Sequence, residues 1–155
     1  MTESAWIQAI SDAGLKVRNR LIWSKAFQGA GDLETTYGPQ HESIIFAAKG
    51  RHVLAGPRDG DVWGEPIGAN GCFRKGYVHP NQKPVRLISY LLRKSAVEGD
   101  TVLDPYMGSG TTGVACVRAG LNFIGCEIDP AYFAVAQKRL AAEQAKMSLF
   151  AGIEP

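Results

Sequence analysis

The sequence predicts an α/β fold with a mainly parallel sheet, and three features of its C-terminal half carry the prediction. Residues 101–104 have the composition of a short strand, residues 111–119 that of a helix ended by Gly120, and residues 122–128 that of a second strand. Two strands joined by a crossover helix pair in parallel. A final helix is expected from Pro130 to about Glu143, because proline suits the first helical turn.

The N-terminal half predicts one helix and two strands. Residues 5–13 have helical apolar spacing, and Gly14 follows where a helix is commonly capped. Residues 15–23 alternate in character as a strand does, and residues 43–48 form a compact apolar run that suits a buried strand. Between these strands, residues 26–39 are rich in Gly, Gln, Asp and Thr and predict a surface loop before a short helix or strand.

The middle of the chain predicts a long irregular excursion followed by a helix. Residues 50–78 contain six glycines after Gly50, with two prolines, a composition that favours turns over regular elements. Loops of this length inside small domains are usually functional. After Pro84, apolar residues recur at helical spacing, so a helix is expected to about Val97, with a stop at Gly99.

Length, charge, apolar content and cysteine number limit the class of protein. A chain of 155 residues suits one compact domain, and a formal charge of +2 confines any nucleic-acid contact to a local patch. No signal peptide or apolar run long enough to span a membrane is visible, so a soluble, cytoplasmic protein is expected. Cys72, Cys116 and Cys126 are odd in number and widely spaced, which predicts reduced, mostly buried thiols and no metal site.

A glycine loop between the predicted strand and helix indicates a nucleotide-like ligand. Gly108, Gly110 and Gly113 fit G-x-G-x-x-G, and Glu127 follows at the distance expected of a ribose-binding acid. Glycines allow close approach of a ligand, and the helix N-terminus presents N–H groups. Plain strand-to-helix packing is the alternative for the glycines. A nicotinamide dehydrogenase uses the same fingerprint, but only 28 residues follow Glu127, too few for a second nucleotide-binding half.

Three segments together resemble the β-class amino-DNA methyltransferases: residues 79–84 (HPNQKP), 104–113 (DPYMGSGTTG) and 125–132 (GCEIDPAY). Weaker similarity covers residues 21–25, 41–49 and 61–63, so the resemblance runs from about Trp6 to Leu140. It implies a Rossmann-like fold, permuted so that the cofactor unit is C-terminal. It also implies methyl transfer from S-adenosylmethionine to an exocyclic amino group of DNA, with adenine N6 favoured over cytosine N4.

The resemblance assigns roles by position. Asp104 would bind the methionine amino group, residues 108–110 would supply backbone contacts, Glu127 would bind the ribose, and Lys83, with His79 and Gln82, would serve the methionine carboxylate. A solvated lysine before a proline turn is the alternative for Lys83. The complete implied cofactor set is Asp104, Pro105, Tyr106, Gly108, Ser109, Gly110, Thr111, Glu127, Ile128, Asp129, His79, Gln82 and Lys83.

The catalytic tetrapeptide of this family, an Asp, Asn or Ser followed by Pro-Pro-Tyr, does not occur in the sequence, so no catalytic residue is assigned. Residues 104–107 lack its second proline and belong to the cofactor motif. At least two parallel strands of the usual sheet are expected to be absent, as in a fragment or a decayed homologue. The exposed sheet edge then predicts self-association, strand exchange or a partner chain. Cytosine C5 chemistry is disfavoured because no cysteine follows a proline.

Two regions outside the cofactor motifs suggest partners. Double-stranded DNA is the expected substrate, and residues 50–78 are a candidate target-recognition excursion, because members of the family that the chain resembles often place target recognition there. The candidate contacts in or beside it are Lys49, Arg51, Arg58, Arg74 and Lys75, with scattered solvated charges as the alternative. Residues Lys146–Phe150 resemble the peptide that bacterial replication proteins insert into the sliding clamp, with Lys146 in place of glutamine; the alternative is a tail that covers its own core. A non-enzymatic DNA- or partner-binding relic is the alternative function.

Overall fold

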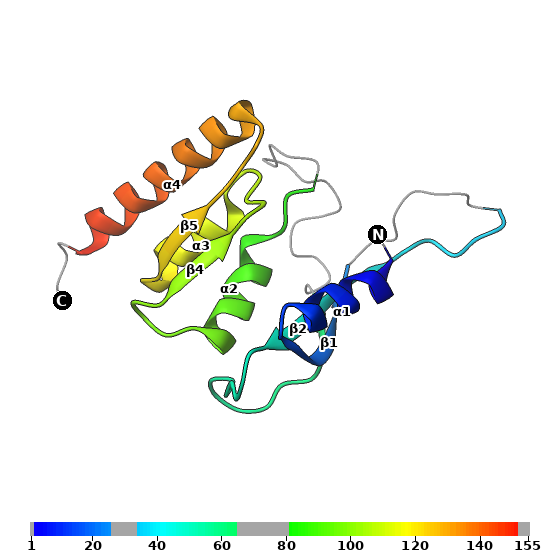
Figure 1. The fold of residues 1–155 in the computed structure, drawn as a ribbon. Helices are drawn as coiled ribbons and strands as arrows, with labels where there is room; N and C mark the ends of the chain where they lie inside the picture. Colours follow the sequence, from blue (N-terminus) through cyan, green and yellow to red (C-terminus); the bar gives the residue numbers. More distant parts are fainter. Residues whose placement is uncertain (1, 26–33, 65–80, 152–155) are drawn as a thin grey trace. The chain divides into compact units, whose positions relative to one another are not determined.

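The computed structural model describes residues 2–25, 34–64 and 81–151 (Figure 1). The chain divides into two compact units. The N-terminal unit comprises residues 1–53 and 57–74, and the C-terminal unit comprises residues 54–56 and 75–155. Within the described ranges, no helix has the length and apolar character needed to cross a membrane.

The N-terminal unit contains helix α1 (Glu3–Asp12) and a sheet of β1 (Lys16–Ser24), β2 (His41–Ala48) and β3 (Val62–Gly64) in the order β2-β1-β3. Thr2 caps α1, since its hydroxyl accepts a hydrogen bond from the backbone N–H of Ala5 at 3.4 Å. β1 pairs with β2 in antiparallel fashion and with β3 in parallel. The predicted helix and both strands are therefore confirmed.

The expectation that residues 50–78 lack regular elements is wrong at β3. This strand has three residues, too few to show a period in the sequence. Its pairing partners are Ile22, Trp23 and Ser24 of β1. Long-range pairing of this kind is invisible to a local pattern.

The C-terminal unit contains α2 (Val85–Ser95), β4 (Thr101–Asp104), α3 (Thr111–Ala119), β5 (Asn122–Gly125) and α4 (Pro130–Ala151). β4 and β5 pair in parallel, which confirms the predicted strand–helix–strand unit. Two predicted boundaries are wrong. β5 ends at Gly125 because β4, its only partner among the described strands, ends at Asp104. α4 continues beyond Glu143 because residues 141–151 are rich in good helix formers and contain no Gly or Pro.

Glycines let the elements of the C-terminal unit approach closely. A Cβ on Gly113 of α3 would lie 2.8 Å from the ring of Phe123 on β5. Phe123 therefore faces α3, which also contacts α2 and α4. Its neighbours on the strands, Leu103 and Ile124, point to the opposite sheet face and are 63% and 55% exposed. One face of this small sheet is thus covered by helices and the other exposes apolar side chains.

An ion pair joins α3 to α4. Arg118 Nε lies 2.6 Å from Glu143 Oε1, and Lys146 Nζ lies 3.6 Å from Glu143 Oε2. Glu143 is buried, whereas Arg118 is half exposed. The hydrogen bond from Arg118, assisted by the charges of Arg118 and Lys146, holds the pKa of Glu143 below its usual range.

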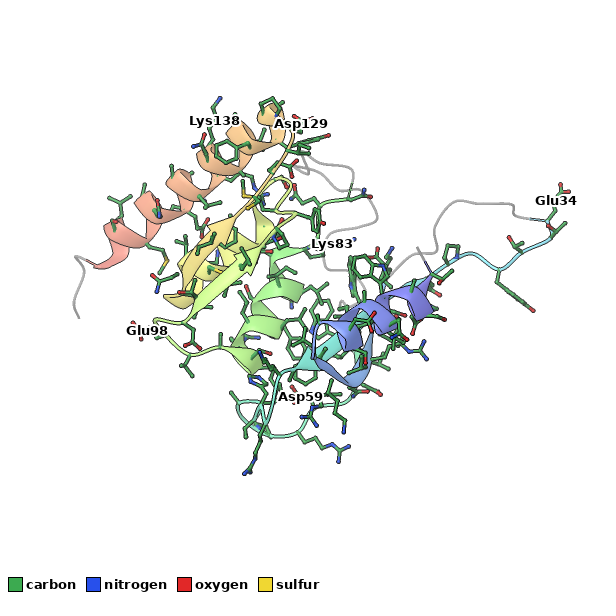
Figure 2. The ribbon with its side chains drawn as sticks, in the orientation of Figure 1. Glu34, Asp59, Lys83, Glu98, Asp129 and Lys138 are labelled. Carbon is green, nitrogen blue, oxygen red and sulfur yellow. The ribbon has the colours of Figure 1, made fainter. Side chains whose placement is uncertain are left out.

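This lowered pKa predicts a pH-dependent contribution to stability. The contribution is fully present above the pKa of Glu143 in the unfolded chain and is lost as the pH falls through its lower folded pKa. Glu143→Gln should lower the free energy of unfolding at pH 7, because it removes the negative charge that pairs with Arg118 and Lys146. The loss should be only about 1 kcal/mol, because water screens the half-exposed Arg118. Urea denaturation over a pH series should show the gap between wild type and variant closing towards acid pH. Glu98→Gln removes an exposed carboxylate of the same unit and is the matched control (Figure 2). A gap that is constant with pH would contradict the assignment.

Candidate binding site at the glycine loop

A cavity of about 370 Å³ lies in the C-terminal unit, where β4 and β5 end. Crevices at the carboxyl ends of parallel strands are the usual ligand sites of α/β folds. The lining combines two carboxylates, amides and hydroxyls with a few apolar side chains. The lining residues are Asn81, Gln82, Lys83, Ile88, Asp104, Tyr106, Met107, Gly108, Ser109, Thr111, Thr112 and Glu127.

The glycine loop presents backbone N–H groups at this cavity. Gly108 and Gly110 both have positive φ, 53° and 78°, and the loop closes through a hydrogen bond from Gly110 N to Met107 O of 2.8 Å. Gly110 is also the N-cap of α3, and no side chain caps this helix. The first turn of α3 therefore directs its N–H groups and the positive end of the helix dipole at whatever occupies the site.

Two carboxylates hold the loop in this shape. Asp104 accepts hydrogen bonds from Tyr106 N at 3.1 Å and from Thr112 Oγ1 at 2.6 Å. Glu127 accepts from Gly108 N and from Asp129 N, both at 2.9 Å. An ionised carboxylate offers about four lone-pair sites, so each group can also accept protons from a ligand. Structural and binding roles are compatible at both positions.

Thr111 provides an independent indication of a ligand. Thr111 is 6% exposed and lines the cavity. Its hydroxyl nevertheless has no hydrogen-bond partner within the described part of the chain. Burying a hydroxyl without a partner is costly, so such groups usually meet a ligand or water. A polar ligand in the cavity would supply the partner.

Ser109 links the loop to two distant segments of the C-terminal unit. Its side chain is buried, and its Oγ donates to Gln82 Oε1 at 2.9 Å. Arg139, on α4, donates from Nη1 to the Oγ of Ser109 at 2.9 Å and also to its backbone carbonyl oxygen. The loop is thus tied to the segment before α2 and to the middle of α4.

The structure brings together eight of the residues implied as cofactor contacts: Gln82, Lys83, Asp104, Tyr106, Gly108, Ser109, Thr111 and Glu127 all line the cavity. Four others do not line it: Pro105, Gly110, Ile128 and Asp129. Gly110 instead meets α4, where a Cβ would lie 2.9 Å from Ala136. Asp129 caps α4 by accepting from Ala131 N at 2.8 Å (Figure 2). His79 lies outside the described residues.

Four lining residues were missed by the sequence reasoning: Asn81, Ile88, Met107 and Thr112. Asn81, Met107 and Thr112 stand inside the motifs that carry the resemblance, so membership of those motifs was the available signal. Ile88 gave no such signal, because its position in an apolar helical period predicts a core residue.

The remaining predicted positions lie elsewhere. Lys49, Arg51 and Arg58 are exposed on the N-terminal unit, whereas Arg74 and Lys75 lie outside the described residues. The prediction of mostly buried thiols holds for Cys116 but is wrong for Cys126, which is exposed just after β5 ends; Cys72 is not described.

Cys116 lacks the properties of a nucleophile. Burial, with a smaller effect of the nearby Asp104 charge, raises its pKa to about 11. The thiolate is the reactive form of cysteine, so this thiol stays protonated and inert at neutral pH.

Comparison with known proteins places this chain in a family. A family model described as DNA methylase (N6_N4_Mtase) matches residues 1–138. The type II methyltransferase M2.DpnII of Streptococcus pneumoniae is 35% identical over 149 residues, covering 87% of this chain and 55% of that protein. M2.LlaDCHI of Lactococcus lactis subsp. cremoris is 34% identical over 146 residues, covering 85% of this chain and 54% of that protein. The chain therefore spans about half the length of these relatives.

Solved structures agree with this comparison. The crystal structure of the M1.HpyAVI–SAM complex superposes with a TM-score of 0.75 at 30% identity, covering 88% of this chain and 68% of that one. The cytosine-N4-specific PvuII DNA methyltransferase, at 17% identity and a TM-score of 0.72, shares the fold. These similarities confirm the predicted Rossmann-like α/β fold. Since the family model covers most of the chain, the protein belongs to the N6/N4 DNA methylase family.

Proposed function

We propose that this chain is the cofactor-binding half of an amino-DNA methyltransferase and that its cavity binds S-adenosylmethionine. The observation that carries the proposal is the combination of an uncapped α3 N-terminus, an unpartnered Thr111 hydroxyl and two carboxylates around one cavity. The similarity to a chain solved with S-adenosylmethionine supports the choice of ligand. When bound, the cofactor supplies the methyl group from its sulfonium centre.

The residues around the cavity match the functional groups of this ligand. The first turn of α3 and Lys83 offer positive charge and N–H donors to the methionine carboxylate. Asp104 offers a carboxylate to the ammonium group, and its negative charge also favours a sulfonium cation nearby. Glu127 offers acceptors to the two ribose hydroxyl groups.

Methyl transfer also requires a segment that residues 1–155 do not contain. The catalytic tetrapeptide is absent from the sequence, and β4 pairs on one edge only in the described part of the C-terminal unit. We place the missing segment on the unpaired edge of β4, where a parallel strand would satisfy its backbone groups and help cover Leu103 and Ile124. A partner chain, self-association or strand exchange could supply this strand, as the sequence predicts.

The proposed substrate is double-stranded DNA, methylated at an exocyclic amino group, with adenine N6 favoured and cytosine N4 as the alternative. Lys49, Arg51 and Arg58, all exposed, would contact phosphates. Contacts of this kind position DNA but carry no sequence information, so no recognition site follows from them. The clamp-binding hypothesis for residues 146–150 also stays a prediction; these residues form the last turns of α4.

A radiolabelled methyl-transfer assay tests the proposed activity. Residues 1–155 alone should transfer no label from S-adenosylmethionine to unmethylated genomic DNA. Adding a segment that carries the strand and the Asp/Asn/Ser-Pro-Pro-Tyr tetrapeptide, fused or in trans, should produce labelled DNA. A complemented chain that binds the cofactor and labels no DNA would instead support a non-enzymatic relic.

A further inference from the structure

We propose that Arg139 is a positioning residue for the cofactor site, acting through Ser109 on the glycine loop and on Gln82. The inference rests on the proposed function, since the site it serves is the proposed S-adenosylmethionine cavity. Arg139 does not line that cavity. It lies on α4, 30 residues after Ser109, so its role is created by the fold alone.

Arg139 contacts both the backbone and the side chain of Ser109 in the glycine loop. Its Nη1 donates to the carbonyl oxygen and to the side-chain oxygen of Ser109, the residue between Gly108 and Gly110. Ser109 is 3% exposed, so these hydrogen bonds are shielded from water. A charge-assisted bond to a shielded acceptor is among the stronger hydrogen bonds in proteins. Arg139 therefore restrains the residue between the two glycines of the loop.

The contact also sets the direction of a hydrogen-bond chain. A guanidinium group only donates, so the Ser109 oxygen must accept from Arg139. The hydroxyl proton of Ser109 is directed to Gln82, whose Oε1 accepts it at 2.9 Å. Arg139 occupies one of the two lone pairs of the Ser109 oxygen and so favours the orientation in which Gln82 Oε1, and not Nε2, faces Ser109. Because Gln82 lines the cavity, a residue outside the site influences the orientation of a side chain inside it.

Without Arg139, both restraints relax. Both lone pairs of the Ser109 hydroxyl would then be available to the Gln82 amide nitrogen, so the preference for the observed amide orientation would weaken. The loop carbonyl would lose its charged donor, and the buried Ser109 would keep fewer partners. Both changes lower the population of the binding-ready site, and the measured affinity falls in proportion.

The test compares Arg139→Met, Arg139→Lys and the control Lys138→Met, which removes the neighbouring exposed charge of α4 (Figure 2). Titration with S-adenosylmethionine should show Kd raised about tenfold in Arg139→Met, about one hydrogen bond's worth. Arg139→Lys should recover part of the loss, and Lys138→Met should match wild type. In a Gln82→Ala background, Arg139→Met should raise Kd by a smaller factor, because the amide that Arg139 orients through Ser109 is already absent. An unchanged Kd in Arg139→Met, or full additivity with Gln82→Ala, would overturn the proposal.

A measurement without ligand separates this inference from the proposed function. In the ligand-free chain, the ¹⁵N side-chain amide signals of Gln82 should shift or broaden in Arg139→Met and remain unchanged in Lys138→Met. If the wild type binds no S-adenosylmethionine but these signals respond, the proposed function fails and the positioning contact stands. If the wild type binds the cofactor and the signals do not respond, the positioning role fails and the proposed function stands.

Discussion

Gly110→Ala should lower the free energy of unfolding by about 2–5 kcal/mol, one of the two largest effects expected from a single substitution in this chain. A methyl group at Gly110 would stand 2.9 Å from the Cβ of Ala136 and from the Cδ1 of Leu140. It would also occupy the left-handed region, at φ 78°, which costs about 1–2 kcal/mol for a residue with a Cβ. Overpacking adds about 1–3 kcal/mol. Urea denaturation followed by circular dichroism measures the loss.

Gly99→Ala is the matched control for this prediction. Gly99 lies in the same unit and has a similar φ of 87°, but a Cβ there would meet nothing within 4 Å. It therefore isolates the cost of the backbone conformation, and the excess loss in Gly110→Ala measures the contact between α3 and α4. Equal losses in the two variants would show that α4 does not pack against Gly110.

Glu127→Ala should weaken S-adenosylmethionine binding by about 1–3 kcal/mol, or about five- to 150-fold in Kd. Two effects combine here. The proposed acceptor of the ribose hydroxyls is lost, and Gly108 N and Asp129 N lose the carboxylate that both now share. The substitution therefore affects the ligand contact and the shape of the loop. Isothermal titration calorimetry measures the change.

Glu127→Gln distinguishes the two effects, since the amide keeps one acceptor oxygen and loses the charge. It should bind the cofactor with an affinity between those of wild type and Glu127→Ala. Glu98→Gln, remote from the cavity lining, should leave Kd unchanged. An unchanged Kd in Glu127→Ala would refute the assignment of this residue.

The strand–helix–strand unit could be predicted from the sequence because its signals are local. Gly120 ends α3 with a left-handed cap, and Pro130 begins α4. The residues that start and stop the helices therefore agree with the spacing of the apolar residues. Glu127 could likewise be found by its position after the second strand, and Asp104 by the family resemblance; both line the cavity. Such information lies within a few residues of each element.

The features that were missed depend on contacts between distant parts of the chain. Gly110 was recognised as part of the ligand loop, but the close approach of α4 to it was not. Arg139 gave no signal, because an arginine on a helix is usually a solvated charge, and its partner Ser109 is far away in the sequence. β3 depends in the same way on pairing with β1. Tertiary contacts of this kind are absent from any local pattern.

The central claim is that the cavity bounded by the glycine loop and Glu127 is an S-adenosylmethionine site. Calorimetric titration of residues 1–155 with S-adenosylmethionine tests it most directly. The account predicts saturable binding with one site per chain, weakened in Glu127→Ala while circular dichroism shows that the fold is retained. A folded wild-type chain that gives no saturable heat, or binding that Glu127→Ala leaves unchanged, would contradict it.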